Sequence, residues 1–439
     1  MSIPLDRLYN FIDQTAREIY GDAVTIYRFF PHGSKKQEDL KPLIELSLDW
    51  FENITRPNMI CHDQEPLNFN LYNFPEKSLN NVVSTLGEWV KKSQAVSEMC
   101  SQMHLRSSLE WPLNCYNRVL LCHSEKNSRE LEIYENNGFV GVYWWSHAII
   151  SRDWFRYAQH DPVLTAKFDL IEKDFLIYNR AWSGSREYRL KLTELLADQD
   201  LIKNCKVKFC PIDNETNYIN HNFKNLSLQI KRTDLHDLFE KNTYESHASA
   251  DYENIDYATT GIELVLETLF DDDRWHLTEK TLRPIACGRP FLLATTPGSL
   301  KYLKSYGFQT FGDYIDESYD SINDPLDRLT ALIKEMKRIC NLDAVKKQEL
   351  WNTLYKISKV NQELFFSNNW QNQIVLEYQK NFQQALIVMN QNKTGKYLQL
   401  INKEKQKKPK FAKTVNSWCE KHRSPEDVLR LYRHIGVTV

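Results

Sequence analysis

The stretch Gly261–Phe311 constrains the fold of this chain more than any other part of it. Two short apolar runs, Ile262–Glu267 and Pro290–Ala294, have the length and composition of buried strands. We expect a helix over Thr278–Cys287, between the two runs, and a second helix after Pro297. This strand–helix–strand–helix order is typical of α/β domains. The stretch therefore predicts a parallel sheet.

The first of these helices carries charge at its amino end. Thr278 is a candidate N-cap, and Gly288 is a candidate C-terminal stop. Ligands of open α/β sheets bind at the carboxyl edge of the strands, where free N–H groups of a helix start attract phosphate. Lys280 and Arg283 add positive charge there, and Glu279 adds a carboxylate that suits a ribose diol. We therefore predict a phosphate site; a simple capping signal is the alternative.

A second strand-to-helix turn carries arginine side chains. Asp174–Tyr178 has the pattern of a buried strand, and Ser185–Leu201 has the pattern of a long helix. Arg180 follows the strand, and Arg186 lies in the predicted first turn of the helix. A diphosphate at this turn would meet a guanidinium group and free N–H groups. Ordinary surface arginines on a helix are the alternative interpretation.

The central stretch contains short motifs in a fixed order after Glu267, and together they carry a family resemblance. The motifs are Thr278–Thr281 (Thr-Glu-Lys-Thr), Pro284-Ile285, Pro290-Phe291 and Pro297–Leu303 (Pro-Gly-Ser-Leu-Lys-Tyr-Leu). With them the chain resembles the donor-binding part of GT-B glycosyltransferases, most nearly the fucosyltransferase-like group and the glycosyltransferase-like proteins of tailed phages. The resemblance is close over Gly261–Tyr319 and weaker at Asp63–Pro66 and Asn179–Arg189.

This resemblance implies an α/β fold of two Rossmann-like domains that face a cleft, followed by C-terminal helices. It implies an inverting glycosyltransferase that takes a nucleotide-sugar as co-substrate and needs no cofactor. Lys280 and Arg186 would stabilise the departing diphosphate, Glu279 would hold the ribose, and Glu267 would orient the donor or those cations. The implied donor-binding residues are Arg180, Arg186, Glu267, Thr278, Glu279, Lys280 and Arg283.

The acidic run Asp271-Asp272-Asp273 is the candidate metal site of the sequence. Asp-x-Asp holds manganese in the other large glycosyltransferase fold. Here the run precedes a cationic helix start, and a fold with Lys and Arg at the phosphates needs no ion. We therefore predict no metal at these residues.

Inverting sugar transfer needs a group that accepts the proton of the acceptor hydroxyl. Asp63 and Glu65 follow a predicted strand, Asn58–Cys61, in the N-terminal part of the chain. His147 follows another predicted strand, Phe139–Trp145. We predict Asp63 as the general base, with Glu65 second and His147 third. For each of them, a local hydrogen-bonding role is the alternative.

The 439 residues are enough for two domains with extensions. We expect an N-terminal Rossmann-like acceptor domain over residues 1–168. A C-terminal Rossmann-like domain that binds the nucleotide-sugar would span residues 169–340, and C-terminal helices with a basic tail would span residues 341–439.

The charge of the chain is close to balanced, with a formal net charge of −2. No global basic field therefore marks a nucleic-acid-binding protein. The C-terminal tail contains a lysine-rich run, which is either a solvated tail or a contact for a polyanion such as DNA. The candidate nucleic-acid-binding residues of this run are Lys405, Lys407, Lys408 and Lys410.

Cysteine usage and apolar content bear on the compartment. The nine cysteines form no Cys-x-x-Cys pair, and their odd number suggests reduced thiols. Met1–Pro4 have neither the basic region nor the apolar run of a signal peptide. No apolar stretch approaches the roughly 20 residues that a spanning helix needs. We expect a cytoplasmic enzyme, in the host cytoplasm if a phage encodes it, without a membrane partner.

The acceptor is the most open part of the prediction. Tailed phages often glycosylate hydroxymethylcytosine in their own DNA, so the resemblance implies double-stranded DNA with modified cytosine as the acceptor and a pentose such as arabinose as the sugar. A glycan or protein acceptor is the alternative within the enzyme class. A non-catalytic nucleic-acid-binding or structural phage protein is the alternative from another class. The sequence leaves the oligomeric state open.

Overall fold

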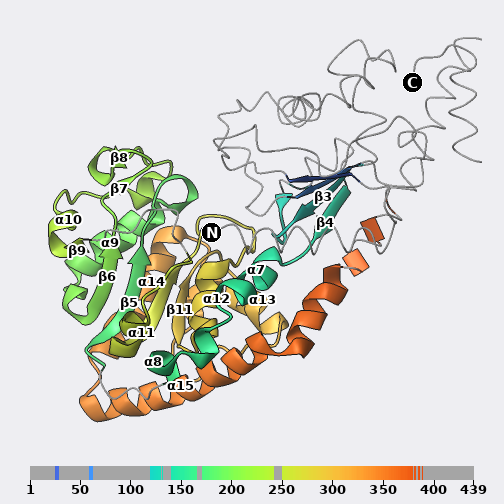
Figure 1. The fold of residues 1–439 in the computed structure, drawn as a ribbon. Helices are drawn as coiled ribbons and strands as arrows, with labels where there is room; N and C mark the ends of the chain where they lie inside the picture. Colours follow the sequence, from blue (N-terminus) through green and yellow to red (C-terminus); the bar gives the residue numbers. More distant parts are fainter. Residues whose placement is uncertain are drawn as a thin grey trace, which may run out of the picture. The chain divides into compact units, whose positions relative to one another are not determined.

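The chain divides into two compact units, which are shown in Figure 1. The main unit is formed by residues 147–374, and the second unit by residues 5–146 with residues 375–439. The structure is a computed structural model. It describes residues 25–28, 59–62, 119–129, 131, 140–165, 171–241, 250–378, 380–381, 384–385 and 388.

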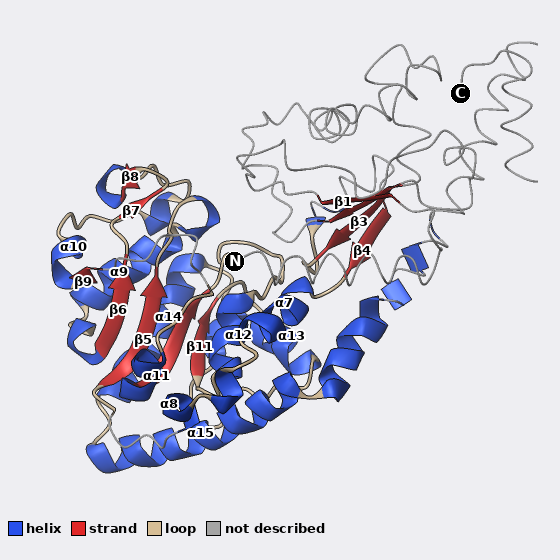
Figure 2. Cartoon of the chain, in the orientation of Figure 1, coloured by secondary structure: helices blue, strands red, loops and turns tan. Residues whose placement is uncertain are grey.

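The main unit is built on a five-stranded sheet, drawn in red in Figure 2. The strands lie in the order β11–β10–β5–β6–β9, and every neighbouring pair is parallel. The parallel sheet predicted from the sequence is therefore confirmed, and β5, β10 and β11 lie at predicted strands. The bounds are β5 (Lys173–Asn179), β6 (Cys205–Phe209), β9 (Glu240–Lys241), β10 (Thr260–Leu266) and β11 (Phe291–Ala294).

The direction of strand addition reverses at the centre of this sheet. From β5 the chain adds β6 and β9 on one side, and it then returns to add β10 and β11 on the other side of β5. Such a reversal is the topological switch point of a doubly wound sheet, and it opens a crevice at the carboxyl ends of the two central strands. In this sheet the crevice follows Asn179 of β5 and Leu266 of β10.

Helices flank the sheet of the main unit. α9 (Tyr188–Asp198) follows β5 and packs against α14 (Pro325–Cys340), while α12 (Glu279–Ala286) connects β10 to β11 and packs against α15 (Ala344–Phe366). Right-handed crossovers that run in opposite directions place α9 and α12 on opposite faces of the sheet. The shorter elements are α7 (Ser146–Trp154), η4 (Ala158–His160), α8 (Pro162–Thr165), η5 (Gly184–Arg186), η6 (Ile202–Asn204), β7 (Ile212–Asp213), β8 (Thr216–Asn217), η7 (Tyr218–Asn220), η8 (Leu226–Leu228), α10 (Leu235–Leu238), α11 (Asn254–Thr259), α13 (Ser299–Ser305) and η9 (Ser318–Ser321).

β10 is buried along its whole length, as its apolar sequence predicts. Gly261, near its start, lies where β5 and α15 approach the strand closely. A Cβ atom at this position would lie 2.9 Å from the carbonyl oxygen of Asp174 and 2.9 Å from the ring of Trp351. Glycine therefore allows the close approach of two strands and a helix at one point.

Two helix starts bear on the site. Thr278 caps α12 as predicted, because its Oγ1 accepts the backbone N–H of Lys280 at 3.3 Å. Gly288, with a φ of +63°, follows the end of the same helix. The predicted helix Ser185–Leu201 begins later than expected, because the 3-10 turn η5 precedes α9. Arg186 therefore lies in this turn rather than in the first turn of an α-helix.

The second unit contains a four-stranded parallel sheet in the order β1–β2–β3–β4. Its strands β2 and β4 lie at the predicted strands Asn58–Cys61 and Phe139–Trp145. The chain is therefore an α/β protein with parallel sheets, compatible with a Rossmann-like fold. Within this unit the hydroxyl of Tyr378 lies 3.8 Å from the Sγ of Cys122 of β3. The strands are β1 (Thr25–Arg28), β2 (Met59–His62), β3 (Val119–His123) and β4 (Val140–Tyr143).

Two further expectations concern membrane spans and thiols. Across the described residues, no helix combines the length and the apolar character that a membrane span requires. Five cysteines whose side chains the structure describes are free thiols: Cys122, Cys205, Cys210, Cys287 and Cys340.

Candidate functional site

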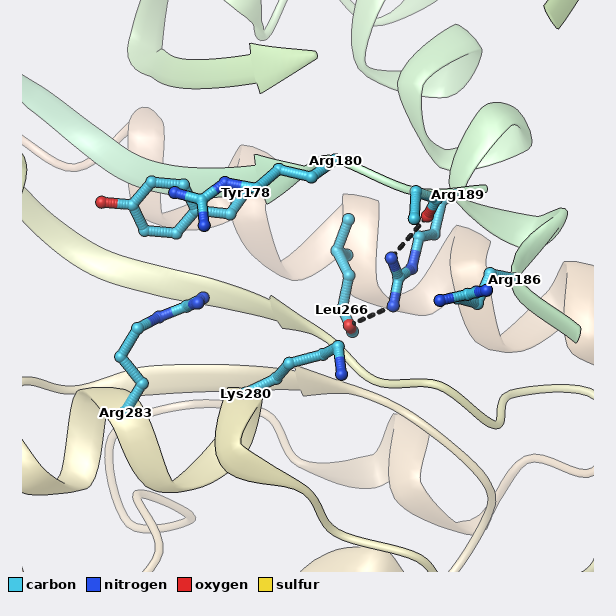
Figure 3. Close-up of a pocket in the computed structure, with 8 residues that line it drawn as sticks. Tyr178, Arg180, Arg186, Arg189, Leu266, Lys280 and Arg283 are labelled. Carbon is cyan, nitrogen blue, oxygen red and sulfur yellow. Dashed lines mark hydrogen bonds between the residues drawn. The ribbon is translucent and has the colours of Figure 1, made fainter. Parts of the chain in front are cut away.

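A pocket lies at the switch point of the main unit, at the carboxyl ends of β5 and β10 (Figure 3). It is partly open to solvent, and the space among its lining residues, open solvent included, is about 340 Å³. Five of its eight lining residues are Arg or Lys, which makes it a candidate anion site. The lining residues are Tyr178, Arg180, Ala181, Arg186, Arg189, Leu266, Lys280 and Arg283.

The cationic side chains come from two segments that are far apart in the chain. Figure 3 shows Lys280 and Arg283 extending from α12, Arg180 and Arg186 extending from the segment between β5 and α9, and Arg189 extending from the first turn of α9. The structure therefore brings together the two cationic turns that the sequence singles out. The switch-point topology is the cause, because it makes β5 and β10 neighbours.

Lys280 is the lysine of this pocket, and its ammonium group is held by three oxygen atoms. The Nζ atom lies 2.7 Å from Oε1 of Glu279, 3.2 Å from Oγ1 of Thr278 and 3.3 Å from Oγ1 of Thr268. The side chain is mostly buried, with 12% of it exposed. Lys280 is thus fixed in position before any ligand is bound.

Glu279 contacts a second group on its other oxygen. Its Oε2 lies 3.2 Å from Nδ1 of His147, which is contributed by α7. Burial raises the pKa of Glu279, but Lys280 and His147 lower it further, so that the pKa lies well below its ordinary value. The ring of His147 stands perpendicular to that of His276, with the ring centres 5.2 Å apart. The sequence predicted Glu279 and His147 for separate roles, and the structure places them in contact.

Glu267 binds the start of α12. Its carboxylate accepts the backbone N–H and the hydroxyl of Thr278 at 2.9 and 2.8 Å. It also accepts the backbone N–H and the hydroxyl of Thr281 at 3.1 and 2.5 Å. We expected the N–H groups of this helix start to attract phosphate, but an internal carboxylate already binds two of them. The positive charge that faces the pocket therefore comes from side chains.

Arg283 lines the pocket while its guanidinium is paired with a buried acid. Its Nη2 forms an ion pair with Glu263 of β10, and its Nε lies 3.2 Å from the hydroxyl of Tyr257. Burial lowers the pKa of Arg283, but Glu263 and Tyr257 raise it well above its ordinary value. Arg283 therefore stays charged, with Glu263 as its counter-charge.

Arg189 has a fixed geometry because backbone carbonyls bind it. Its guanidinium donates to the carbonyl oxygens of Ala181 at 2.5 Å, Leu266 at 2.7 Å and Glu267 at 2.9 Å. Carbonyl groups carry no formal charge, so these contacts orient the guanidinium without cancelling its charge. Arg189 thereby links the end of β10 to the segment after β5.

Tyr178 is a pocket residue that the sequence patterns did not single out. The guanidinium carbons of Arg180 and Arg283 lie 4.4 and 4.5 Å from the centre of its ring, which favours both cations. Its hydroxyl donates to Asp256 at 2.9 Å. Burial raises the pKa of Tyr178, so the phenol stays protonated. Its place as the last residue of the predicted strand Asp174–Tyr178 was the available signal.

Asp213 holds the loop that carries Arg186. One of its oxygens accepts the backbone N–H of Trp182, the backbone N–H of Ser183 and the hydroxyl of Ser183, each at 2.7 Å. Burial raises the pKa of Asp213, but these hydrogen bonds lower it by more. Arg186 donates its Nε–H to the carbonyl oxygen of Ser183 at 3.3 Å. The sequence around Asp213 is irregular and gave no signal of this role.

Arg180, a predicted donor-binding residue, lines the pocket and donates to the carbonyl oxygen of Asp251 at 2.7 Å.

Other candidate residues of the sequence analysis do not line the pocket. Within the described ranges, no group of His, Cys, Asp and Glu has the geometry of a metal site. Asp272 instead pairs with Arg274 at 2.6 Å. The candidate residues that lie outside the described residues are Asp63, Glu65, Lys405, Lys407, Lys408 and Lys410.

The pocket gathers more cationic side chains than it has carboxylates in direct contact with them. Glu263 pairs with Arg283 and Glu279 with Lys280, while backbone carbonyls bind Arg189. Arginine forks and a lysine ammonium are the groups that proteins use to bind phosphate. No family model, curated protein or solved structure matches this chain.

Proposed function

We propose that this chain is a nucleotide-sugar-dependent glycosyltransferase, and that the switch-point pocket holds the diphosphate of the donor. The observation that carries the proposal is the cluster of five cationic side chains at the carboxyl ends of β5 and β10. Nucleotide ligands of open α/β sheets bind at this point of the topology. The resemblance of Gly261–Tyr319 to donor-binding segments supports the same ligand.

In the proposed reaction an acceptor hydroxyl oxygen bonds to the anomeric carbon of the sugar as the bond from that carbon to the diphosphate oxygen breaks. The electron pair of the broken bond stays on the nucleoside diphosphate, and the hydroxyl proton passes to a general base. Lys280 and Arg186 would stabilise the charge that develops on the leaving diphosphate. The sugar would be transferred with inversion, because the acceptor attacks from the opposite side.

We further propose a GT-B-like arrangement in which the main unit binds the donor and the second unit binds the acceptor. Asp63 remains the first candidate for the general base, followed by Glu65 and His147. Double-stranded DNA that contains hydroxymethylcytosine is the proposed acceptor, and it rests on the resemblance to phage proteins and on the lysine-rich run of the tail.

The donor proposal is tested by thermal unfolding of the full chain with UDP, GDP, a panel of their sugar conjugates, and inorganic pyrophosphate. A ligand at 100 times its Kd stabilises the folded state by about 2.7 kcal/mol, which shifts Tm by several degrees. We expect such a shift for at least one sugar nucleotide, and we expect Lys280→Ala to abolish it. Lys356→Ala is the matched control, because Lys356 is an exposed lysine of the main unit that does not line the pocket.

Two results would contradict the proposal. Equal ligand shifts in Lys280→Ala and in the wild-type chain would place the phosphates elsewhere. Binding without any hydrolysis or transfer of the sugar, measured across the same panel, would favour the non-catalytic alternative. A sugar-selective hydrolysis of one donor would identify both the nucleotide and the sugar.

A further inference from the structure

We propose that Arg189, which lies outside the donor-binding set implied by the resemblance, binds the diphosphate through its positive charge at the point where the ends of β5 and β10 meet. In this proposal Arg189 has two roles: its N–H groups hold the strand ends, and its charge attracts the ligand. The inference rests on the proposed function, because it concerns an anion bound in the switch-point pocket.

Arg189 connects the two sides of the pocket. It extends from the first turn of α9, and on the β5 side its guanidinium donates to the carbonyl oxygen of Ala181 at 2.5 Å. On the β10 side it donates to the carbonyl oxygens of Leu266 at 2.7 Å and Glu267 at 2.9 Å. Figure 3 shows the guanidinium of Arg189 beside Leu266. The positive charge of this residue is therefore fixed at the switch point of the sheet.

The carbonyl oxygens at the end of β10 would repel a phosphate if nothing covered them, because each is the negative end of a peptide dipole. Those of Leu266 and Glu267 accept hydrogen bonds from Arg189. The next one, of Thr268, accepts from the hydroxyl of Ser185 at 2.9 Å. Arg189 thereby places a full positive charge at an edge that would otherwise be partly negative.

The charge of Arg189 is not offset by an ion pair. Its hydrogen bonds end on carbonyl oxygens, and among the residues that the structure describes no carboxylate forms a salt bridge with it. By contrast, Glu279 contacts Lys280 and Glu263 contacts Arg283. The Arg189 side chain is 2% exposed, so water screens its charge weakly and a nearby anion is attracted more strongly than in bulk water. A buried cation without a counter-charge is costly, so a bound phosphate also stabilises the fold around it.

A purely structural role is the alternative, because the hydrogen bonds alone tie β10 to the segment after β5. The two roles respond differently to substitution. Arg189→Lys keeps the charge and Arg189→Gln removes it, whereas both shorten the side chain and lose the forked contacts of the guanidinium. Both variants should therefore unfold at a lower temperature than the wild-type chain, but only Arg189→Gln loses the attraction for phosphate.

The test is isothermal titration calorimetry of the full chain with inorganic pyrophosphate at neutral pH, at low and at moderate salt. We expect Arg189→Gln to bind pyrophosphate about tenfold more weakly than Arg189→Lys, because one charge close to a multiply charged anion has been removed. The affinity of Arg189→Gln should also depend less on salt. Thermal unfolding without ligand shows which variants are folded, and Arg189→Met is a second neutral variant for the same comparison.

Arg328 supplies the matched control. It is also a buried arginine of the main unit, and its guanidinium donates to the backbone carbonyls of Phe270, Ile322 and Asn323. Arg328 does not line the pocket. Arg328→Lys and Arg328→Gln should therefore both be less stable than the wild-type chain and yet bind pyrophosphate equally well.

Equal affinities of folded Arg189→Lys and the neutral variants would show that Arg189 only holds the strands, and they would leave the proposed donor site in place. A difference between Lys and Gln at position 328 as large as the one at position 189 would also overturn the proposal, because any buried charge of the unit would then have the same effect. If the wild-type chain binds neither pyrophosphate nor any sugar nucleotide, the proposed function itself fails.

Discussion

A cationic residue of a pocket can attract a ligand by its charge or hold the shape of the pocket, and the pair of Arg283 with Glu263 is an example of the second role. Arg283 lines the pocket, yet its guanidinium is paired with a carboxylate that is almost fully buried. Such a residue contributes shape and a fixed position, while the net charge of the pair is zero. The sequence contained a signal of this pair, since Glu263 is an acid inside an otherwise apolar strand and must have a partner.

Glu263→Gln is expected to destabilise the main unit by about 3 kcal/mol, because it leaves the buried guanidinium of Arg283 without its counter-charge. Urea unfolding monitored by circular dichroism measures this loss. The control is the double variant Glu263→Gln with Arg283→Met, which removes both charges and should be clearly more stable than the single variant. A single variant as stable as the wild-type chain would show that the pair has no part in stability.

At the scale of the element, α12 is a helix whose N-terminal backbone N–H groups are capped by a side chain from another part of the chain. Glu267 at the end of β10 and Thr278 at the N-cap together bind the backbone N–H groups of Thr278, Lys280 and Thr281. A carboxylate at this position also interacts favourably with the helix dipole. The strand and the helix that follows it are thereby tied at the edge of the sheet where the pocket lies.

Glu267→Ala is expected to cost about 2 kcal/mol of unfolding free energy, because two backbone N–H groups of the helix start lose their acceptor. Glu267→Gln keeps one acceptor oxygen and should cost less. Chemical unfolding of the three proteins measures the order wild type, Gln, Ala. An Ala variant that is no less stable than the Gln variant would contradict a capping role for Glu267.

The regular elements of the main unit could be predicted from local patterns, but the contacts of the site could not. Ile262–Glu267 and Pro290–Ala294 are buried strands because their residues are apolar over the length of a strand, and that information is local. The roles of Glu267 and Asp213 depend on how a loop returns to a helix or a turn, which no periodicity encodes. The predicted start of α9 failed for the same reason, since η5 is set by the contacts of Asp213 with the preceding loop.

At the scale of the whole molecule, charge is concentrated in particular places while the total is close to zero. The formal net charge is −2, whereas the pocket alone gathers five cationic side chains. Long-range attraction of a polyanion to the entire surface is therefore weak, and binding has to depend on local clusters. For a DNA acceptor, the lysine-rich run that contains Lys405 and Lys410 is the candidate cluster.

If DNA is the acceptor, the full chain should bind a hydroxymethylated duplex with an affinity that falls as salt rises. Replacing Lys405, Lys407, Lys408 and Lys410 by Gln should weaken binding and lower the salt slope by about 0.9 for each phosphate that is no longer neutralised. Gel shift at several salt concentrations measures both effects. No binding of the duplex at low salt would rule out the DNA acceptor. The control is the Lys280→Ala protein, which loses a positive charge outside the tail and keeps the lysine-rich run intact.

The reversal of strand order at β5 also bears on how the chain reaches its native state. β5 precedes β10 by a long stretch of sequence, and the two become neighbours only after the intervening β6 and β9 have been passed. Pairings between such distant segments form slowly, because the entropy of closing a long loop is lost before the contacts between the strands stabilise the pair. The pocket needs both strands, so it exists only in molecules in which β5 and β10 have paired. A phosphate compound should therefore bind folded molecules and not partly folded ones. Its binding would report the late stage of folding at which β5 and β10 pair.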